Sequence, residues 1–159
     1  MDLNIVLLAP EIPQNTGSIG RMCVCIDARL HLIKPMAFSL DETHLRRAGL
    51  DYWGNVRLCI HNSWDAFMEQ EQPERMMFAS TKARTPYYRH CFRLGDYLIF
   101  GSETSGLPVA FYTKYADHLY CIPMPGRHAR SHNLASAVAI IAYEALRQIG
   151  ELSATGRTD

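Results

Sequence analysis

Apolar positions along this chain gather in short runs that are separated by longer segments of mixed polarity. Short runs rich in Val, Ile and Leu, followed by Gly, Pro or polar residues, are typical of buried strands. On this basis we expect strands at residues 3–8, 30–33, 56–60, 76–81, 97–100 and 119–122.

The segments between these runs favour helices that begin at polar caps. The expected caps are Asn15 or Thr16, Asp41, Ser63 and Asn133, with helices over residues 16–28, 42–48, 64–70 and from 134 onward. Residues 82–93 are predicted to be an irregular loop, and a short helix or turn is expected after residue 108. Gly17 and Gly20 lie early in the first helix, where each costs about 1 kcal/mol, which indicates a close approach of another group to this backbone.

Strands that alternate with helices predict an α/β domain, a mostly parallel sheet with helices on both faces. We expect one domain over residues 1–150 and a flexible, polar C-terminal tail over residues 151–159. In such sheets, ligands bind outside the carboxyl ends of the strands. Three of these ends carry unusual residues, at 9–21, 101–108 and 123–133, and together they predict the site.

Composition narrows the possible functions. Sixteen basic residues balance sixteen acidic ones, so any nucleic-acid site must be a local patch. The five cysteines are scattered and form no zinc pattern, and the histidines are not at metal-ligand spacing, so no metal is predicted. We expect no membrane association, reduced thiols and a cytoplasmic location, because no signal sequence or membrane span is evident.

The first candidate segment, residues 10–21, places Asn15, Thr16 and Gly17 one helical turn before Arg21. Polar groups and free N–H groups at a helix start suit a phosphate or ribose. The alternative is a proline-stiffened connection with a solvated arginine.

The second segment, residues 100–108, is not a dinucleotide or NTP-binding loop, since neither glycine pattern is present. Glu103 can bond a sugar or a backbone amide, or simply cap the turn. Residues 125–132 form a cationic loop before a helix start, and the helix itself can be core or a subunit interface. Residues 82–93, with Tyr87 and Tyr88, suit RNA phosphates and stacking, or are a solvated loop.

Taken in order, the three segments resemble the three motifs of the SPOUT superfamily of RNA methyltransferases. The similarity is strongest to the tRNA wobble-nucleotide 2′-O-methyltransferases of the TrmL type and extends over residues 2–150. The motifs are P-x-N-T-G-x-x-x-R from Pro13, G-x-E-x-x-G-L-P from Gly101 and S-x-N-L-x-x-A from Ser131. Ser102 and Ala135 depart from the residues that the family usually has there, Pro and Ser respectively.

The resemblance implies a C-terminal deep trefoil knot, a homodimer, tRNA as substrate and S-adenosyl-L-methionine as cofactor, with S-adenosyl-L-homocysteine as product and no metal. The implied cofactor-binding residues are Ala79, Ser80, Gly101, Glu103, Gly106, Ile122, Met124, Ser131, Asn133 and Leu134. The implied catalytic residues are Arg21, Asn15, Glu103, Ser131 and Asn133, and the substrate-binding residues are Arg21, Lys82, Arg89, Arg130 and Tyr143.

The expected reaction is methylation of the ribose 2′-OH at the wobble cytidine or uridine. Arg21 has the role of proton acceptor in the family; alternatively Arg21 aligns the RNA and His132 or water takes the proton. Two other functions stay open: a cofactor-retaining RNA-binding protein with weak or no catalysis, and a ribosomal RNA 2′-O-methyltransferase.

Overall fold

A computed structural model describes residues 2–39 and 51–150 of the chain. Within these residues, seven strands form one sheet in the order β3-β2-β1-β6-β4-β7-β5, and every strand pairing is parallel. The strands are β1 (Asn4–Leu8), β2 (Arg29–Ile33), β3 (Arg57–His61), β4 (Met76–Ala79), β5 (Thr85–Pro86), β6 (Tyr97–Phe100) and β7 (Leu119–Cys121).

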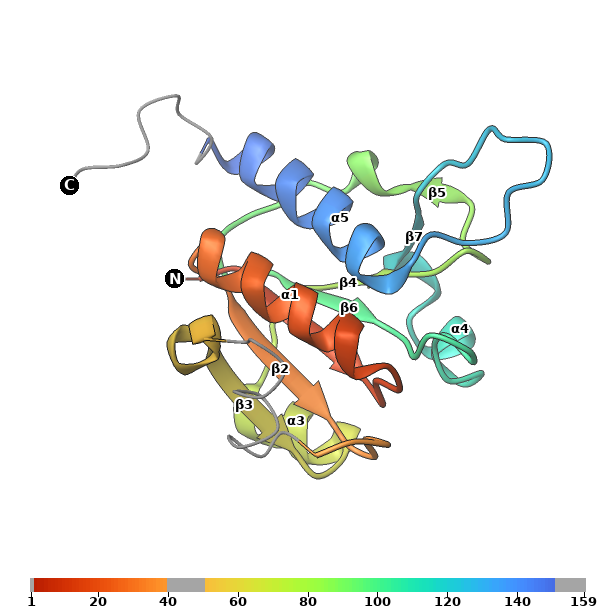
Figure 1. The fold of residues 1–159 in the computed structure, drawn as a ribbon. Coiled ribbons are helices and arrows are strands. Elements are labelled where there is room, and N and C mark those ends of the chain that lie inside the picture. Colours follow the sequence, from red (N-terminus) through yellow and green to blue (C-terminus); the bar gives the residue numbers. More distant parts are fainter. Residues whose placement is uncertain (1, 40–50, 151–159) are drawn as a thin grey trace.

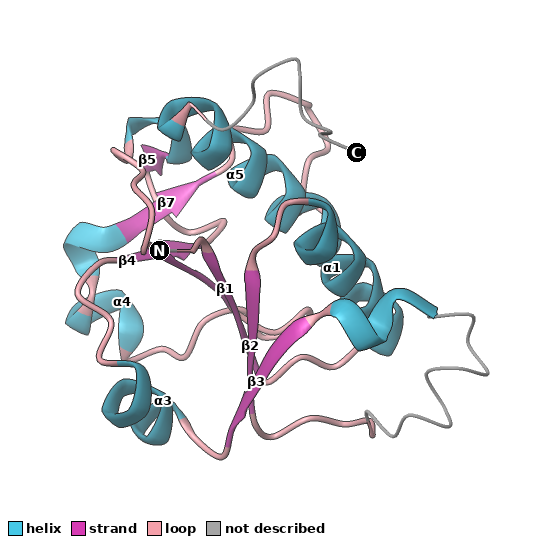
Figure 2. Cartoon of the chain, turned by 90° about the vertical axis from the view of Figure 1, so that its left-hand side faces the viewer, coloured by secondary structure: helices cyan, strands magenta, loops and turns pink. Residues whose placement is uncertain are grey.

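Helices cover both faces of the sheet, as the sequence predicts. Figures 1 and 2 show α1 and α5 side by side on one face, with α3 and α4 on the other. The helices are α1 (Pro13–Cys25), α3 (Trp64–Glu71), α4 (Phe111–Lys114) and α5 (Leu134–Ile149), with short 3-10 helices η1 (Asp51–Asn55), η2 (Tyr87–Arg89) and η3 (Ala116–His118).

Strand β1 explains why the sheet is buried on both sides. All five of its residues are buried, and alternate side chains point to opposite faces of a strand. Ile5 and Leu7 pack in the core beneath α1 and α5, whereas Val6 and Leu8 pack with the residues of α3 and α4. A continuous apolar run therefore marks the central strand of a two-sided parallel sheet.

The helix predicted from Asn15 or Thr16 begins earlier, so the predicted cap is wrong. Helix α1 starts at Pro13, whose ring fixes the backbone angle that a first helical residue needs, and Ile12 is its N-cap. The backbone N–H groups of Asn15 and Thr16 donate to the carbonyl of Ile12 at 3.1 and 3.3 Å, so they are not free for a phosphate.

The close approach that Gly17 and Gly20 predict comes from within the chain. A Cβ on Gly20 would lie 2.5 Å from the indole ring of Trp53. Tyr52 donates its hydroxyl to the carbonyl of Gly17 at 2.7 Å. Gly20 therefore accommodates η1 rather than a ligand, and the carbonyl of Gly17 accepts a hydrogen bond from the same element.

Other predictions hold with small shifts at the ends of elements. Ser63 caps α3 by accepting from the N–H of Ala66, and Asn133 caps α5. Residues 82–93 are more ordered than predicted, because β5 pairs with β7 and η2 follows it. The predicted helix over 42–48 and the tail over 151–159 lie outside the described residues, and the knot stays a prediction.

A group of buried polar side chains interrupts the apolar core under α3. His31 of β2 and His61 of β3 are 0% and 2% exposed, and both contact the ring of Phe67. Burial, with a smaller effect of His61, lowers the pKa of His31 to about 3, so this imidazole is neutral. No helix in residues 2–39 and 51–150 is long and apolar enough to cross a membrane.

Candidate active site

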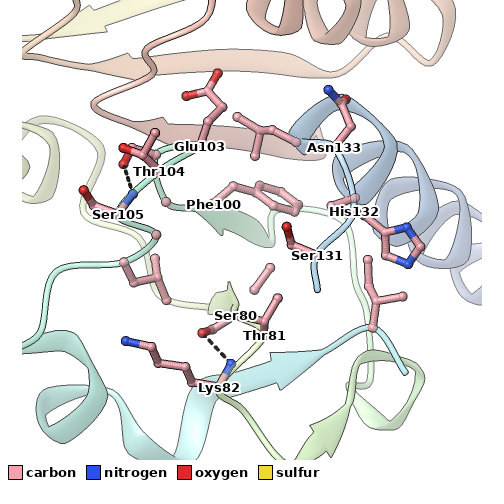
Figure 3. A pocket seen from close by; sticks show the side chains of 18 of the residues that line it. Ser80, Thr81, Lys82, Phe100, Glu103, Thr104, Ser105, Ser131, His132 and Asn133 are labelled. Atoms are coloured by element: carbon pink, nitrogen blue, oxygen red, sulfur yellow. Dashed lines mark hydrogen bonds between the residues drawn. The ribbon is translucent and has the colours of Figure 1, made fainter. Parts of the chain in front are cut away.

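A cavity of about 570 Å³ opens at the carboxyl ends of β4, β6 and β7, beside the start of α5. This is the edge of a parallel sheet at which ligands bind. Figure 3 shows Ser80–Lys82 on one side, Ser131–Asn133 on another and the loop of Glu103 on a third, with Phe100 between them.

Glu103 joins the second motif to the first. Its carboxylate accepts hydrogen bonds from the backbone N–H of Glu11 at 2.8 Å and of Ile12 at 3.1 Å, and from Asn15 Nδ2 at 3.1 Å. These two backbone N–H groups lie at the start of α1, where the helix dipole favours a negative charge. The anion at this helix start is therefore a side chain of the chain itself.

Asn15 continues the connection to the third motif. Its Oδ1 accepts from Asn133 Nδ2 at 2.8 Å, and Asn133 Oδ1 accepts from the N–H of Ala135 at 2.9 Å and of Ser136 at 3.4 Å. Each amide donates in one direction and accepts from the other, so the orientations of both amides are mutually consistent. We call this the Glu103–Asn15–Asn133 chain.

The charge of Glu103 is stabilised by the same contacts. Burial alone would raise the pKa of Glu103, but the hydrogen bonds from the Glu11 backbone and from Asn15 outweigh it. The pKa of Glu103 is therefore held below its usual range, and the carboxylate is ionised at neutral pH.

The turn that carries Glu103 closes on itself through two glycines. Ser102 and Gly106 exchange backbone hydrogen bonds of 3.2 and 3.0 Å, and Gly106 has a positive φ of 68°. A Cβ on Gly101 would lie 2.1 Å from the carbonyl carbon of Gly106. No larger residue fits at Gly101 unless the backbone of this turn moves.

The opposite wall is formed around Ser80. Its hydroxyl lies 2.9 Å from the Tyr112 hydroxyl and accepts from the N–H of Lys82 at 3.1 Å. The Lys82 ammonium lies 5.2 Å from the centre of the Tyr112 ring, which is within the range of a cation–π contact. Lys82 and Arg130 are the two formally cationic residues in the lining.

The structure brings together most of the predicted site residues. All ten residues predicted to bind the cofactor line the cavity, together with Lys82 and Arg130. Arg21, Arg89 and Tyr143 do not line it. The Arg21 guanidinium lies 4.7 Å from the Tyr52 ring centre, Arg89 ends η2, and Tyr143 is 45% exposed on α5.

Some lining residues were not predicted. Phe100 and Leu107 are apolar and buried, so in the sequence they are indistinguishable from other core residues. Tyr112 belongs to the short helix α4, whose position over Ser80 depends on the tertiary fold. His132, considered only as an alternative proton acceptor, also lines the cavity.

Known proteins are similar to this chain over nearly its whole length. A tRNA (cytidine(34)-2'-O)-methyltransferase of Saccharophagus degradans is 47% identical over 149 residues, covering 92% of this chain and 96% of that protein. A putative RNA methyltransferase from Bacillus anthracis has a solved structure with a TM-score of 0.91 and 36% identity, covering 98% of this chain and 99% of that one.

A further solved structure concerns the 2-OH methylation of C/U34 on tRNA; it is 45% identical, with a TM-score of 0.84, and the match covers 92% of this chain and 95% of that one. Residues 2–143 match the SpoU rRNA Methylase family. The three motif segments that meet at the cavity all fall within that match, and the chain belongs to the SpoU rRNA Methylase family.

Proposed function

We propose that this protein is an S-adenosyl-L-methionine-dependent tRNA methyltransferase that methylates the ribose 2′-OH of nucleotide 34, a cytidine or uridine. The observation that carries the proposal is the convergence of the three motif segments on one cavity, joined by the Glu103–Asn15–Asn133 chain. Support for the substrate comes from the 47% identical relative, which bears that activity in its name and matches over 96% of its length.

The cavity suits this cofactor in size and chemistry. Its volume of about 570 Å³ lies within the range of small-molecule sites. Apolar side chains of Phe100, Ile122 and Leu134 offer a surface for a flat base, whereas the glycine turn offers backbone groups to polar atoms. When bound, the cofactor supplies the electrophilic methyl group.

The chain's cations offer local RNA contacts despite its zero net charge. Lys82 and Arg130 lie at the cavity, where they can hold RNA phosphates beside the reacting ribose. Arg89 follows β5 on an exposed 3-10 helix and extends the same basic segment. Positioning of this kind is the main contribution that an enzyme makes to an in-line transfer.

Glu103, Asn15 and Asn133 act in this proposal as positioning residues. The carboxylate of Glu103 already accepts from three donors, which stabilise its charged form, so it is a poor acceptor for the 2′-OH proton. The two asparagine amides are likewise engaged with each other and with the start of α5. What they fix is the relative placement of the three loops.

For the proton itself, we propose His132 as the acceptor and Arg21 as a residue that aligns the RNA. A guanidinium is always protonated in proteins and cannot accept a proton. Arg21 also lies over Tyr52 rather than in the cavity lining. The imidazole of His132 lines the cavity and belongs to the side-chain type most often used as a general base.

We further propose that the enzyme is a cytoplasmic homodimer. Helices α1 and α5 form one layer (Figure 2), and Arg21 and the 45% exposed Tyr143 lie on it. Ile12, 40% exposed at the start of α1, adds apolar surface. A second copy on this layer would bring these residues close to the RNA path.

The test is a transfer assay with the full chain, labelled cofactor and total tRNA, followed by mapping of the methylated nucleotide. Label at the 2′-OH of nucleotide 34 is the expected result. A parallel assay replaces the tRNA with ribosomal RNA. Label that enters only the ribosomal RNA would replace the substrate assignment, and cofactor binding without any transfer would overturn the enzymatic one. His132→Ala should lower kcat at least about a hundredfold without weakening cofactor binding, as expected for loss of a general base.

A further inference from the structure

A second cluster of functional side chains lies outside the active-site cavity, under α3. It consists of His31 in the middle of β2, His61 at the end of β3 and Glu71 at the end of α3. The two imidazoles are buried, and the Glu71 side chain is 18% exposed. Cavity and cluster share no residues.

The outer nitrogen of each ring lies within hydrogen-bond distance of a side-chain amide oxygen. His31 Nε2 lies 3.2 Å from Asn4 Oδ1, and the orientation of Asn4 is fixed because its Nδ2 donates to the carbonyls of Asp2 and Asp96. His61 Nδ1 lies 2.9 Å from Gln70 Oε1. A neutral imidazole that donates from one nitrogen carries a lone pair on the other.

In the tautomers that donate to Asn4 and Gln70, two lone pairs face each other inside the protein. They belong to His31 Nδ1 and His61 Nε2, which are 3.1 Å apart. Lone pairs at this distance repel unless something positive lies between them. The ring planes are nearly parallel, with 17° between them. Both nitrogens bind one ion when each ring turns by about 40°, so that its lone pair points beside the 3.1 Å line that joins them.

Glu71 supplies a third atom that can bind a metal ion at the same point. Its Oε1 lies 3.8 Å from both His31 Nδ1 and His61 Nε2, and its Oε2 accepts from the Tyr97 hydroxyl at 3.3 Å. In a triangle with these three sides, the point equidistant from its corners is about 2.1 Å from each atom, which is the length of a Zn–N or Zn–O bond.

We propose that His31, His61 and Glu71 form a binding site for a divalent transition metal, Zn²⁺ in the first place, that ties α3 to the β2–β3 edge of the sheet. Two histidines and one glutamate are an established zinc ligand set, with a fourth position for water on the exposed side of Glu71. Ligand histidines in metal sites donate their other N–H to an oxygen, as Asn4 and Gln70 accept here.

Calcium and magnesium do not fit this donor set, because they prefer oxygen ligands. The site was not predicted from the sequence, since its residues are 30 and 10 positions apart and match no metal motif. Parallel pairing of β2 with β3 and the return of α3 across them bring the residues together. The proposal does not depend on the methyl-transfer activity.

The test is Zn²⁺ binding to the full chain after chelator treatment, measured by calorimetry and by the Zn²⁺-dependent rise in Tm. We expect one site per chain in the original protein. Glu71→Gln and His61→Gln should each weaken binding at least about tenfold and abolish the rise in Tm. His118→Gln, a substitution of an exposed histidine outside the cluster, should change neither.

Folding of each variant is checked by its Tm in the absence of metal, so loss of binding is not confused with unfolding. Glu71→Gln retains the size of the side chain and a partner for Tyr97, which makes it the decisive variant. The proposal is overturned if no site is titrated, which would mean that a proton shared by the two rings accounts for their geometry. It is also overturned if binding persists in Glu71→Gln and disappears when the cysteines are alkylated.

Discussion

Replacement of Glu103 by glutamine tests how much the Glu103–Asn15–Asn133 chain contributes to stability. The substitution keeps the size of the side chain but leaves only one acceptor oxygen. The glutamine oxygen can take the place of Oε1, which serves Ile12 and Asn15, and its NH₂ group then faces the N–H of Glu11 across 2.8 Å. One charge-assisted hydrogen bond is lost, and the NH₂ group of the glutamine and the N–H of Glu11, both hydrogen-bond donors, face each other.

The loss should be about 2 kcal/mol, near the lower end of the range for hydrogen bonds to charged groups because Glu103 is partly exposed. For a chain of this length, that corresponds to a fall in Tm of about 4–8 °C. The control is Glu11→Gln, which affects only a surface contact with Thr104. Thermal unfolding at pH 7, followed by circular dichroism, gives both values, and a fall no larger in Glu103→Gln than in the control would refute the reasoning.

The pH dependence of this difference provides a second check. Since the folded pKa of Glu103 is lowered from 4.5, the stabilisation is fully present above the unfolded pKa and is lost as pH falls through the folded value. The gap in Tm between the original protein and Glu103→Gln should therefore be constant near neutrality and narrow below about pH 4.5. A gap that narrows around pH 7 would mean that another group carries the effect.

Three further substitutions test other parts of the structure. Gly101→Ala should weaken cofactor binding more than tenfold, measured by calorimetry, because the added Cβ would lie 2.1 Å from backbone atoms. The control Gly54→Ala, whose Cβ would have no atom within 4 Å, should bind the cofactor normally. Equal effects of the two substitutions would contradict the closed turn at Gly101. Arg21→Ala should abolish methyl transfer in the labelled-cofactor assay and leave cofactor binding intact, and loss of that binding would disprove an aligning role. Asp96→Asn should cost about 2 kcal/mol in denaturant unfolding, because the buried side chain loses charge-assisted hydrogen bonds from Arg75 and from the N–H of Arg93. A loss below about 1 kcal/mol would show that these contacts are replaceable.

Much of the fold follows from apolar runs, since a strand buried on both faces leaves a continuous signal. The run at Tyr97–Phe100 coincides with β6, and the all-buried β1 extends from Asn4 to Leu8 within the predicted 3–8. The predicted start of α1 was wrong because Asn15 was taken as the helix cap. In the structure, the side-chain amide of Asn15 bonds instead to Glu103 and Asn133, which lie 88 and 118 positions away. Local sequence contains no information on such partners.

The site divides in the same way. Glycines and polar residues at three strand ends predicted where the site lies, whereas Gly101, Glu103 and Asn133 were predicted as individual site residues from the family resemblance. Phe100 was missed because a buried aromatic looks the same whether it lines a cavity or fills the core. The cluster of His31, His61 and Glu71 was missed because its contacts depend on the register of β2 and β3, and not on the spacing of the three residues in the sequence.

The Glu103–Asn15–Asn133 chain also has a consequence for protein synthesis. Its members come from the beginning, the middle and the last part of the sequence, and Asn133 also starts the final helix. While the polypeptide emerges from the ribosome, the strands up to β7 can assemble before Asn133 is made. Until then, Asn15 lacks the hydrogen bond that the Asn133 amide donates to it. The cavity therefore acquires its full lining only after residues 130–137 have been made.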